Sequence, residues 1–426
     1  MRVAEADLEL SREPFARPFA FKGSAFHEKW CPAVRLADGS GVVAVGVGGL
    51  AVLWADPRVF QAHTETGGNA LQLAVLEEAL RLVTGRDFPD PLALHDAIVD
   101  PVHDYACRIT GLPDLRLTFT LVALTALDYA SWLLDAGGRG TDSFDGLVPE
   151  PFRADLAERQ TRVAVAPAVG YTLPDDTVRA LLDAGAGVLK IKIGQPGSQA
   201  EMVGKDIERL DRVHALAGGR RAELSESSEV LYYLDANGRY NTKDAMARLL
   251  DHCRRGGYLD RIVLVEEPFS RPEATDVHGL PARFAGDESV ESAADVRTRV
   301  EQGYTAFAIK TAGKTFSRSL RMLRAAREAG AVCFVADNAC VPASLEWNKN
   351  VAARLPAFPG LHGGLIESNG AENYAHWEQL LAGQPRPEAR WLRPQRGAFV
   401  LDEDYYRESG GVFAPIHAYA RLFRKS

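Results

Sequence analysis

The chain has 426 residues, of which 46% are hydrophobic and 25% are charged, an ordinary composition for a globular protein. It carries 49 lysines and arginines against 57 aspartates and glutamates, so its formal charge is −8. A net acidic chain is a poor candidate for binding nucleic acid, because that affinity comes mainly from lysine and arginine contacts to phosphates. A chain of this length buries a large core, so the fold requires neither disulfides nor a structural metal.

The five cysteines are scattered and form no C-x-x-C pair, which is typical of free thiols in a reducing compartment. The first residues, MRVAEADLELSREPF, contain no apolar stretch of the kind found in secretory signals. The most apolar segment, 117–134, is interrupted by three threonines and an aspartate, so it predicts a buried helix rather than a membrane span. We therefore expect a cytoplasmic protein that binds neither membranes nor nucleic acid.

An N-terminal α+β capping domain is predicted for residues 1–155. Residues 32–49 alternate between apolar and polar around the turn Asp38-Gly39-Ser40-Gly41, which predicts a β-hairpin. The same run contains a G-x-G-x-x-A pattern, but no clear helix follows it. We attribute its glycines to a flexible hairpin end rather than to a dinucleotide site. Helical patterns follow at 69–83, 91–105 and 117–135.

From about residue 161, short apolar runs alternate with amphipathic helical segments, and glycine recurs where the helices end. The runs lie at 161–169, 188–194, 230–238, 262–268, 282–289, 305–313, 331–338 and 361–370. Eight β-then-α units imply a closed (β/α)8 barrel of the TIM type over residues 156–384. An open doubly wound sheet is the competing interpretation, although it usually has fewer units. We expect the tail, 385–426, to run back over the N-terminal sheet and complete the first domain.

The predicted strands end in polar residues, and function in such barrels sits at the C-terminal ends of the strands. Lysines stand at the ends of strands two and six, and carboxylates end the three strands between them, at Asp235, Glu266 and Asp287. Three carboxylates in a narrow barrel mouth repel one another unless they bind a cation. Oxygen ligands favour a hard cation, and Mg2+ is the first choice because it keeps positions open for water or substrate; Mn2+ is the alternative.

The lysines supply the basic groups of this predicted site. Because alternate residues of a strand share a face, Lys190 and Lys192 both point into the barrel and Ile191 points outward. A lysine is a poor base near its free pKa of about 10.4, but burial and nearby positive charge lower that pKa. With Lys310 on the far side, the proton α to a substrate carboxylate can leave from one face and return on the other. The cation stabilises the negative charge of the enediolate intermediate.

Taken in order, these motifs resemble those of the enolase superfamily, and within it the muconate lactonizing enzyme and dipeptide epimerase subgroup of the mandelate racemase/muconate lactonizing enzyme family. The matching motifs are K-x-K at Lys190 and Lys192, D-x-N at Asp235 and Asn237, E-x-P at Glu266 and Pro268, D-E-S at 287–289, and the strand-six Lys310. The stretch ALDYASWLLDAGG is also similar to the family's A-x-D-x-A-x-W segment. The resemblance covers most of the chain.

The resemblance implies a role for each of these residues. Asp235, Glu266 and Asp287 are expected to be the Mg2+ ligands, and Lys192 and Lys310 the acid/base pair that racemises or epimerises a small carboxylate substrate.

Other polar residues are expected to support this machinery. Lys190 is expected to lower the pKa of Lys192 and to contact the substrate carboxylate. Asn237 and Glu288 are expected just behind the ligands, with Glu288 near Lys310. The candidates for further substrate contacts are Asp337, Asn338 and Glu367, although the first two could instead cap the next helix.

The sequence departs from the family pattern in three places. Ala312-Gly313-Lys314 stands where a Gly-Gly pair is usual, and we expect Lys314 to be a loop residue. Glu367-Ser368-Asn369 replaces the D-x-D with which dipeptide epimerases grip a substrate ammonium, which puts a dipeptide substrate in doubt. Strand seven holds no histidine, which disfavours the mandelate racemase subgroup. Loops at about 18–29 and 52–68 are expected to form a partly apolar lid.

Other functions stay open at this point. The same residues could run a β-elimination, such as dehydration of an acid sugar, or a cycloisomerisation. A Schiff-base aldolase using Lys310 is a remote alternative, because it leaves the three carboxylates unexplained. A non-catalytic barrel is the other remote alternative. We also expect the chain to form a homo-oligomer.

Overall fold

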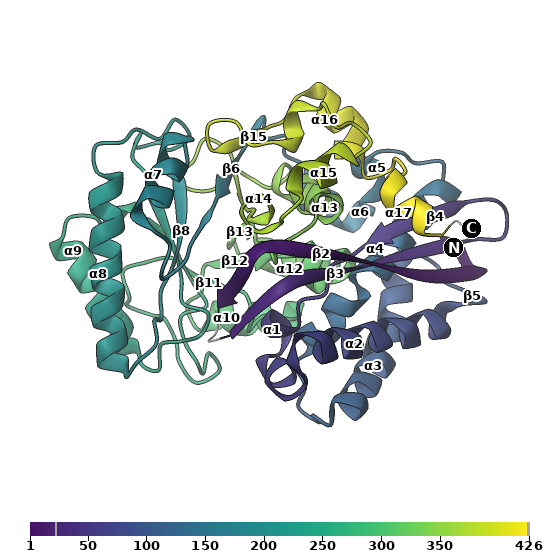
Figure 1. The fold of residues 1–426 in the computed structure, drawn as a ribbon, viewed down its shortest axis with the longest axis horizontal. Helices are drawn as coiled ribbons and strands as arrows, with labels where there is room; N and C mark the ends of the chain where they lie inside the picture. The colour runs from purple at the N-terminus through teal and green to yellow at the C-terminus, as the bar shows by residue number, and fades with distance from the viewer. Residues whose placement is uncertain (22–23, 424–426) are drawn as a thin grey trace.

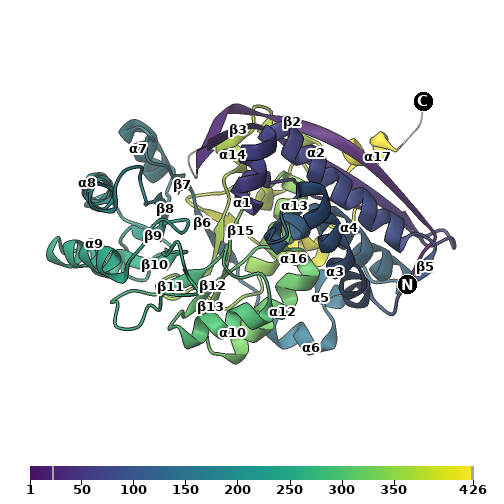
Figure 2. The ribbon, with the colours of Figure 1, turned by 90° about the horizontal axis from the view of Figure 1, so that it is seen from below.

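The computed structural model describes residues 1–21 and 24–423 and is a mixed α/β structure. In Figure 1 the strands and helices of the barrel occupy the left and centre, and the helices of the N-terminal part lie at the lower right. A long hairpin of strands β2 and β3 crosses from one part to the other. Figure 2 shows the same hairpin along one edge of the molecule, next to helices α1 and α2.

The N-terminal sheet has the antiparallel order β2 (Glu5–Phe21), β3 (Ser24–Ala37) and β4 (Val43–Val47). Strand β1 (Arg2–Val3) pairs separately with β5 (Arg86–Asp87). The predicted hairpin at residues 38–41 is confirmed between β3 and β4. The prediction of a loop at 18–29 is wrong, because β2 and β3 pair there, for example Phe19 with Phe26. Residues 22 and 23 of that stretch lie outside the described part of the chain.

Four helices complete the N-terminal part: α1 (Val52–Ala55), α2 (Pro57–Val83), α3 (Pro91–Thr110) and α4 (Leu117–Gly138). The three predicted helices are confirmed, and each is longer than predicted. The prediction of a loop at 52–68 is wrong, because α1 and the first part of α2 occupy it; α2 is kinked within this stretch, at Thr64 (φ 61°, ψ 179°). Asp56 accepts a hydrogen bond from the Arg58 amide, and Pro57 is the first residue of α2. Both are signals of a helix start, but the segment has too weak an apolar periodicity to predict a helix.

Helix α4 packs directly against the N-terminal sheet. A β-carbon at Gly46 of β4 would lie 2.2 Å from the carbonyl oxygen of Ala126, so this glycine permits close contact with α4. Close packing therefore explains the glycine, and the predicted flexible hairpin end is wrong here. Helix α4 is long and apolar enough to cross a membrane, but 89% of its most apolar window is buried, as in a core helix.

The second part is a curled ten-stranded sheet. Its strands are β6 (Arg162–Ala166), β7 (Ala168–Val169), β8 (Val188–Lys192), β9 (Leu231–Asp235), β10 (Ile262–Glu266), β11 (Phe284–Gly286), β12 (Ala306–Ile309), β13 (Val332–Val335), β14 (Gly364–Glu367) and β15 (Ala398–Val400). Strands β6 and β7 are one run interrupted at Pro167; β6 pairs in parallel with β14, and β7 pairs in parallel with β8. This run therefore closes the eight parallel units into the predicted barrel.

Helices follow most strands. The longer ones are α7 (Asp175–Asp183), α8 (Gln199–Ala217), α9 (Lys243–Arg255), α10 (Ala293–Glu301), α12 (Phe316–Glu328) and α13 (Pro342–Ala352). The shorter ones are α5 (Phe144–Leu147), α6 (Glu150–Arg153), α11 (Thr311–Lys314), α14 (Gly370–Asn373), α15 (Trp377–Ala382), α16 (Glu403–Glu408) and α17 (His417–Leu422). A helical stretch predicted after the fourth strand is wrong, because residues 268–283 form bends, turns and coil. Pro272, Gly279 and Pro281 interrupt a helix there.

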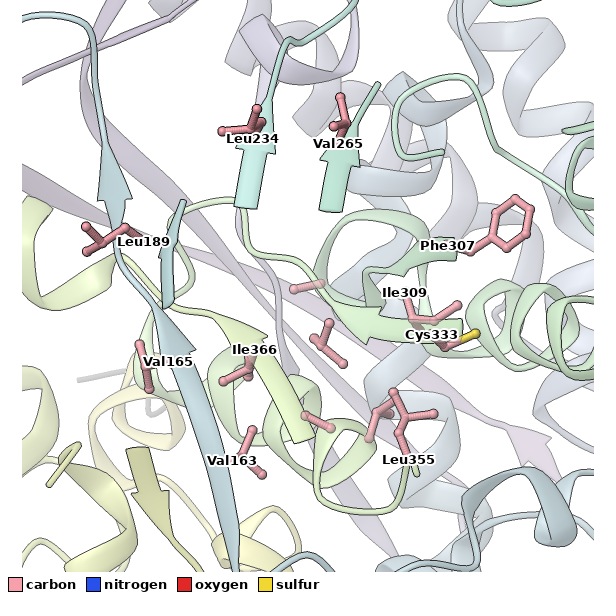
Figure 3. Packing of buried hydrophobic residues seen from close by; sticks show 14 of the residues in the cluster. Val163, Val165, Leu189, Leu234, Val265, Phe307, Ile309, Cys333, Leu355 and Ile366 are labelled. Atoms are coloured by element: carbon pink, nitrogen blue, oxygen red, sulfur yellow. The ribbon is translucent and has the colours of Figure 1, made fainter. Parts of the chain in front are cut away.

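Alternation along the strands separates two cores. Many side chains that face the helices are large, and Figure 3 labels several residues of this outer layer, among them Leu189, Leu234 and Ile366. Side chains that face the barrel axis are often alanines, such as Ala164, Ala285 and Ala308, because the interior is narrow. Ile191 belongs to the outer layer, and Lys190 and Lys192 alternate with it, so both lysines face inward as predicted.

The tail and helix α4 join the two parts. Strand β15 pairs antiparallel with β6 of the barrel, and α17 contacts β2 and β4 of the N-terminal sheet. On α4, the Asp128 carboxylate accepts hydrogen bonds from the amides of Phe316 and Ser317 at 2.7 and 3.1 Å. The indole of Trp132 donates to the Ser317 hydroxyl at 2.9 Å. The A-x-D-x-A-x-W segment thus holds the start of α12, directly after the loop that carries Lys310.

Candidate active site

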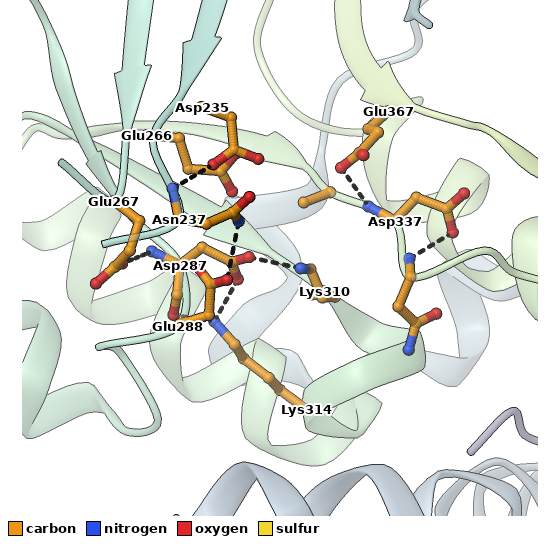
Figure 4. A network of polar contacts seen from close by, with 12 residues as sticks. Asp235, Asn237, Glu266, Glu267, Asp287, Glu288, Lys310, Lys314, Asp337 and Glu367 are labelled. Atoms are coloured by element: carbon orange, nitrogen blue, oxygen red, sulfur yellow. Dashed lines mark hydrogen bonds and ion pairs between the residues drawn. The ribbon is translucent and has the colours of Figure 1, made fainter. Parts of the chain in front are cut away.

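A cavity of about 650 Å3, its open mouth included, lies where the barrel strands end and the N-terminal part covers them. Most of the residues predicted for the site line it: Lys190, Lys192, Asp235, Asn237, Asp287, Lys310, Asp337, Asn338 and Glu367. Glu266 does not line the cavity and is fully buried, and Glu288 is also buried. Figure 4 shows the polar contacts among the strand-end groups.

On the strand-two side, Lys190 is the centre of a carboxylate cluster. Its Nζ lies 3.0 Å from Asp235, 2.7 Å from Glu266 and 2.8 Å from Glu367. Lys192, nearer the cavity, donates to the same Asp235 oxygen at 2.5 Å and to Asn237 Oδ1 at 3.1 Å. The ends of β8, β9, β10 and β14 therefore meet at one point, as the strand-end pattern predicted.

On the strand-six side, two lysines share one carboxylate. Lys310 donates to Asp287 Oδ2 at 2.6 Å, and its Nζ lies 4.1 Å from the centre of the Trp54 ring. Lys314 lies 3.0 Å from Asp287 Oδ1 and donates to the Asp287 carbonyl oxygen at 2.7 Å. The expectation that Lys314 is a loop residue is wrong: the short helix α11 turns its side chain inward, where it is fully buried.

Glu267 is a part of the site that the sequence did not indicate. Its carboxylate accepts hydrogen bonds from the amides of Asp287 and Ser289 at 2.8 and 3.2 Å, so it fixes the end of β11. Its φ is +40°, so its side chain does not follow the alternation of inward and outward side chains along β10, which ends at Glu266. Burial and the neighbouring Glu288 raise the pKa of Glu267 to about 7. Asn237 donates to Glu288 at 3.0 Å and so joins this group to Lys192.

The charges of the site hold one another in place. Burial raises the pKa values of Asp235 and Asp287. The adjacent ammonium groups lower them by more, so both carboxyl pKa values lie below their usual range. Burial, and then repulsion from Asp235, raise the pKa of Glu266 well above its usual value. For Lys310, burial lowers the pKa, but Asp287, Glu266 and the other nearby carboxylates together outweigh burial, so the net pKa is raised. Lys310 beside Asp287 is therefore in its ammonium form.

The carboxylates fit a hard cation by their chemistry. Ammonium groups now occupy the space between them, and within residues 1–21 and 24–423 no three acidic, histidine or cysteine side chains converge closely enough to hold a metal ion. Glu266 Oε1, however, is buried and accepts no hydrogen bond within the same residues. This unpaired carboxyl oxygen of Glu266, together with the carboxylates of Asp235 and Asp287, makes a set of oxygen ligands suited to Mg2+.

Strands seven and eight bring the remaining candidates together. The amide of Asp337 donates to Glu367 at 3.0 Å, and the Asp337 carboxylate accepts from the amides of Asn338, Cys340 and Asn369. Asp337 thus organises the loop before α13, and Val341 rather than Asp337 precedes that helix. Asp337, Asn338 and Glu367 also line the cavity, so they stay candidates for touching substrate.

Comparison with solved structures identifies the fold. A mandelate racemase/muconate lactonizing protein from Herpetosiphon aurantiacus superposes with a TM-score of 0.63 at 16% identity, covering 94% of this chain and 96% of that chain. A dipeptide epimerase from Enterococcus faecalis, complexed with Mg and L-Leu-L-Tyr, gives 0.62 at 17% identity, covering 88% and 92%. L-talarate dehydratase from Polaromonas, complexed with Mg and L-glucarate, gives 0.58 at 17% identity, covering 86% of each.

No family model and no curated protein sequence matches the chain. The structural likeness extends over the N-terminal part as well as the barrel, since it covers 86% or more of this chain in all three comparisons. These neighbours include an epimerase and a dehydratase, which are enzymes of one superfamily that catalyse different reactions. The chain accordingly has the mandelate racemase/muconate lactonizing enzyme fold of the enolase superfamily.

Proposed function

We propose that the protein is an enzyme that removes the proton α to a substrate carboxylate and returns it on the opposite face, as a racemase or epimerase. The observation that carries the proposal is the position of Lys192 and Lys310. Strands β8 and β12 are four places apart in a ring of eight, so the two amines enter the cavity from opposite sides. A substrate carbon between them has one amine at each face.

Asp235, Glu266 and Asp287 are the proposed holders of a divalent cation, Mg2+ first and Mn2+ second. A bound divalent cation supplies positive charge that stabilises the negative charge developing on the substrate carboxylate. With their charge balanced in this way, Asp235 and Asp287 would hold the ammonium groups of Lys192 and Lys310 less tightly, and both amines would be available to exchange protons with the substrate. Lys190 stays paired with Glu367 and keeps the strand ends together.

The proposed roles divide the work among the chain's own groups. Lys192 Nζ takes or gives the proton on the strand-two face, and Lys310 Nζ does so on the strand-six face. Asn237 holds Lys192 from one side, and Trp54 covers Lys310 from the other. Asp128 and Trp132 hold the start of α12, which follows the short helix α11 next to Lys310.

The second candidate is a dehydratase, in which one lysine removes the α-proton and the other assists departure of a β-hydroxyl group. The L-talarate dehydratase among the structural neighbours favours this alternative. It predicts a keto acid product that reacts with semicarbazide. Racemisation predicts no such product.

Deuterium exchange tests the proposal directly. The full chain is incubated in D2O with Mg2+ and, separately, with mandelate, N-acetyl-L-phenylalanine, L-Ala-L-Glu or D-glucarate, and loss of the α-proton signal is followed by NMR. We expect exchange with at least one acid, its abolition by EDTA and its recovery with Mg2+ or Mn2+. Exchange that continues unchanged in EDTA would overturn the cation's role. Absence of exchange from all four acids would overturn the proposed reaction.

A further inference from the structure

The segment directly after Lys192 is held closely against its neighbours. Gly194 has a φ of +88°, a backbone conformation that favours glycine. A β-carbon at Gly194 would lie 2.5 Å from Cβ of Arg239 and 3.1 Å from the carbonyl oxygen of Ala236, so this segment touches the loop that follows β9. That loop also carries Asn237, a hydrogen-bond partner of Lys192. The backbone after the strand-two base therefore lies against the loop that orients the base.

One buried carboxylate fixes this segment. Asp206 lies on α8, which packs beside α9 on the left of Figure 1; it is fully buried and does not line the cavity. Its Oδ2 accepts a hydrogen bond from the Gly194 amide at 2.7 Å, and its Oδ1 accepts from the Gln195 amide at 3.3 Å. The side-chain amide of Gln195 donates to the same Oδ1 at 3.3 Å. Asp206 thus holds the backbone that begins two positions after Lys192.

A buried tyrosine connects Asp206 to the next two strands. The hydroxyl of Tyr240 donates to Asp206 Oδ2 at 2.8 Å, and its ring is fully buried. The Tyr240 amide donates to the carbonyl oxygen of Pro268 at 3.1 Å, and its own carbonyl oxygen accepts from the Ser270 amide at 2.9 Å. Because Tyr240 is fixed on both sides, Asp206 ties the end of β8 to the segments that follow β9 and β10.

The contacts of Asp206 are hydrogen bonds from uncharged groups: two backbone amides, a side-chain amide and a phenol. The basic residues next to it on α8 are engaged elsewhere, since Arg209 pairs with Asp175 and Lys205 donates to the carbonyl oxygen of Pro196. Burial raises the pKa of Asp206, and these hydrogen bonds offset only part of that effect. Burying a carboxylate in this way is unfavourable, so its contribution lies in the amides that it holds.

Lys192 depends on its backbone more than the other cavity lysines do. About one seventh of its side chain, 15%, is exposed, against 2% for Lys190 and for Lys310. Packing therefore restricts its long side chain less, and the position of its Nζ depends on the backbone from which it starts. The amide of Ile193 donates to the carbonyl oxygen of Asp235 at 2.9 Å and holds that backbone on one side. The amides that follow are held by α8.

Building on the proposed function, we propose that Asp206 is a positioning residue for Lys192. Through the amides of Gly194 and Gln195 it fixes the backbone from which the strand-two base reaches the substrate. Tyr240 supports Asp206 and keeps this backbone in place relative to the loop after β9. Neither side chain lines the cavity, so both act only through the position of Lys192.

Asp206→Asn tests the proposal, because an amide keeps the shape of the side chain but offers one acceptor oxygen instead of two. Exchange of the α-proton in D2O with Mg2+ is measured for each enantiomer of an acid that the unaltered protein exchanges, so that each lysine face is followed separately. A displaced base costs rate, so we expect kcat at the Lys192 face to fall at least tenfold. KM, and exchange at the Lys310 face, should stay within twofold. Equal loss at both faces, or unchanged exchange at the Lys192 face, would overturn the proposal and leave the proposed reaction standing.

Tyr240→Phe and Tyr258→Phe are a matched pair of variants. Both tyrosines are buried and donate to an aspartate of α8, Tyr240 to Asp206 at 2.8 Å and Tyr258 to Asp211 at 2.6 Å, but Tyr258 is remote from the segment after Lys192. Tyr240→Phe should slow exchange at the Lys192 face at least threefold relative to the other face. Tyr258→Phe should leave the ratio of the two faces unchanged. An equal change of this ratio in both variants would show that general damage to the barrel causes it, and would contradict the proposal.

A measurement without substrate separates this proposal from the proposed reaction. Acetic anhydride acetylates accessible amines that are not held in ion pairs, and mass spectrometry gives the rate at Lys192. Displacement from Asp235 and Asn237 should raise this rate at least threefold in Asp206→Asn and leave it unchanged in Tyr258→Phe. Unchanged labelling in Asp206→Asn would overturn the proposal whether or not the protein exchanges any acid. Faster labelling in a protein that exchanges no acid would contradict the proposed reaction and support the role of Asp206 in positioning Lys192.

Discussion

The two lysine-bearing sides of the cavity are held in different ways. On the strand-two side, Lys192 is held by Asp235 and Asn237, which both belong to the barrel. On the strand-six side, Lys310 lies between Asp287 of the barrel and Trp54 of the N-terminal part. The start of α12, which follows Lys310 and the short helix α11, is also tied to α4 by Asp128. The position of Lys192 thus depends on contacts within the barrel. The position of Lys310 also depends on contacts between the barrel and the N-terminal part.

This difference has a mechanistic consequence for the proposed reaction. The N-terminal part covers the cavity and contributes Trp54 to its lining. A substrate that contacts Trp54 acts through this ring on Lys310, whereas the partners described for Lys192 belong to the barrel. The two faces of the substrate are therefore expected to respond differently to changes in the N-terminal part.

The largest expected effect comes from removing either base. Lys192→Ala and Lys310→Ala should each lower interconversion of the two enantiomers about 10²–10⁴-fold, the usual contribution of a positioned acid or base. Each variant should still exchange the α-proton of one enantiomer, and the two variants should spare opposite enantiomers. Chiral chromatography and NMR in D2O measure the two rates. Loss of exchange from both enantiomers in both variants would contradict the assignment of one lysine to each face.

Lys314→Met tests the second lysine of the strand-six side. Breaking a buried ion pair typically costs about 3–5 kcal/mol, so urea unfolding in EDTA should show a loss of this order. Mg2+ should restore more stability to this variant than it adds to the unaltered protein, because the cation replaces the missing positive charge beside Asp287.

The control for Lys314→Met is Lys349→Met. Lys349 is also fully buried and pairs with Glu346 at 2.6 Å, away from the cavity. The free energy of unfolding of Lys349→Met should be lower than that of the unaltered protein. Mg2+ should raise this free energy by the same amount in both proteins. An equal Mg2+ shift in all three proteins would refute the idea that Lys314 neutralises the proposed cation site.

Asp128→Asn tests the tie between α4 and the strand-six loop. The variant keeps the shape but replaces one acceptor oxygen by an amide, so we expect a loss of about 1–3 kcal/mol in the free energy of unfolding. Exchange at the Lys310 face should fall more than exchange at the Lys192 face. Equal loss at both faces would show that Asp128 serves the fold as a whole.

Much of the barrel and its strand-end chemistry follows from the sequence, because both rest on local periodicity. Alternation in VLKIKIG places Lys190 and Lys192 inside and Ile191 outside, and the structure agrees. The order of strands then brings Asp235, Glu266 and Asp287 to one rim.

What the sequence missed depends on contacts between distant segments or on unusual backbone angles. Glu267 has a positive φ, and the direction of its side chain therefore cannot be predicted from the alternation of apolar and polar residues. Trp54 reaches Lys310 across 256 positions of chain, counted as 310 − 54. The sequence of 18–29 predicts a loop because its strands are stabilised by pairing with each other rather than by an alternating apolar pattern. The inward position of Lys314 does not follow from the sequence, because a one-turn helix has no periodicity.

The smallest expected effect comes from Trp54, and it addresses the comparison most directly. Trp54→Phe keeps an aromatic face for Lys310, whereas Trp54→Leu keeps an apolar side chain without the π-face. A cation–π contact contributes about 0.5–2 kcal/mol, so Trp54→Leu should slow exchange at the Lys310 face by about 2–30-fold, and Trp54→Phe should recover much of the rate. Exchange at the Lys192 face should stay close to that of the unaltered protein. If Phe and Leu behave alike, Trp54 acts by filling space, and the two lysine sides differ only in their carboxylate partners.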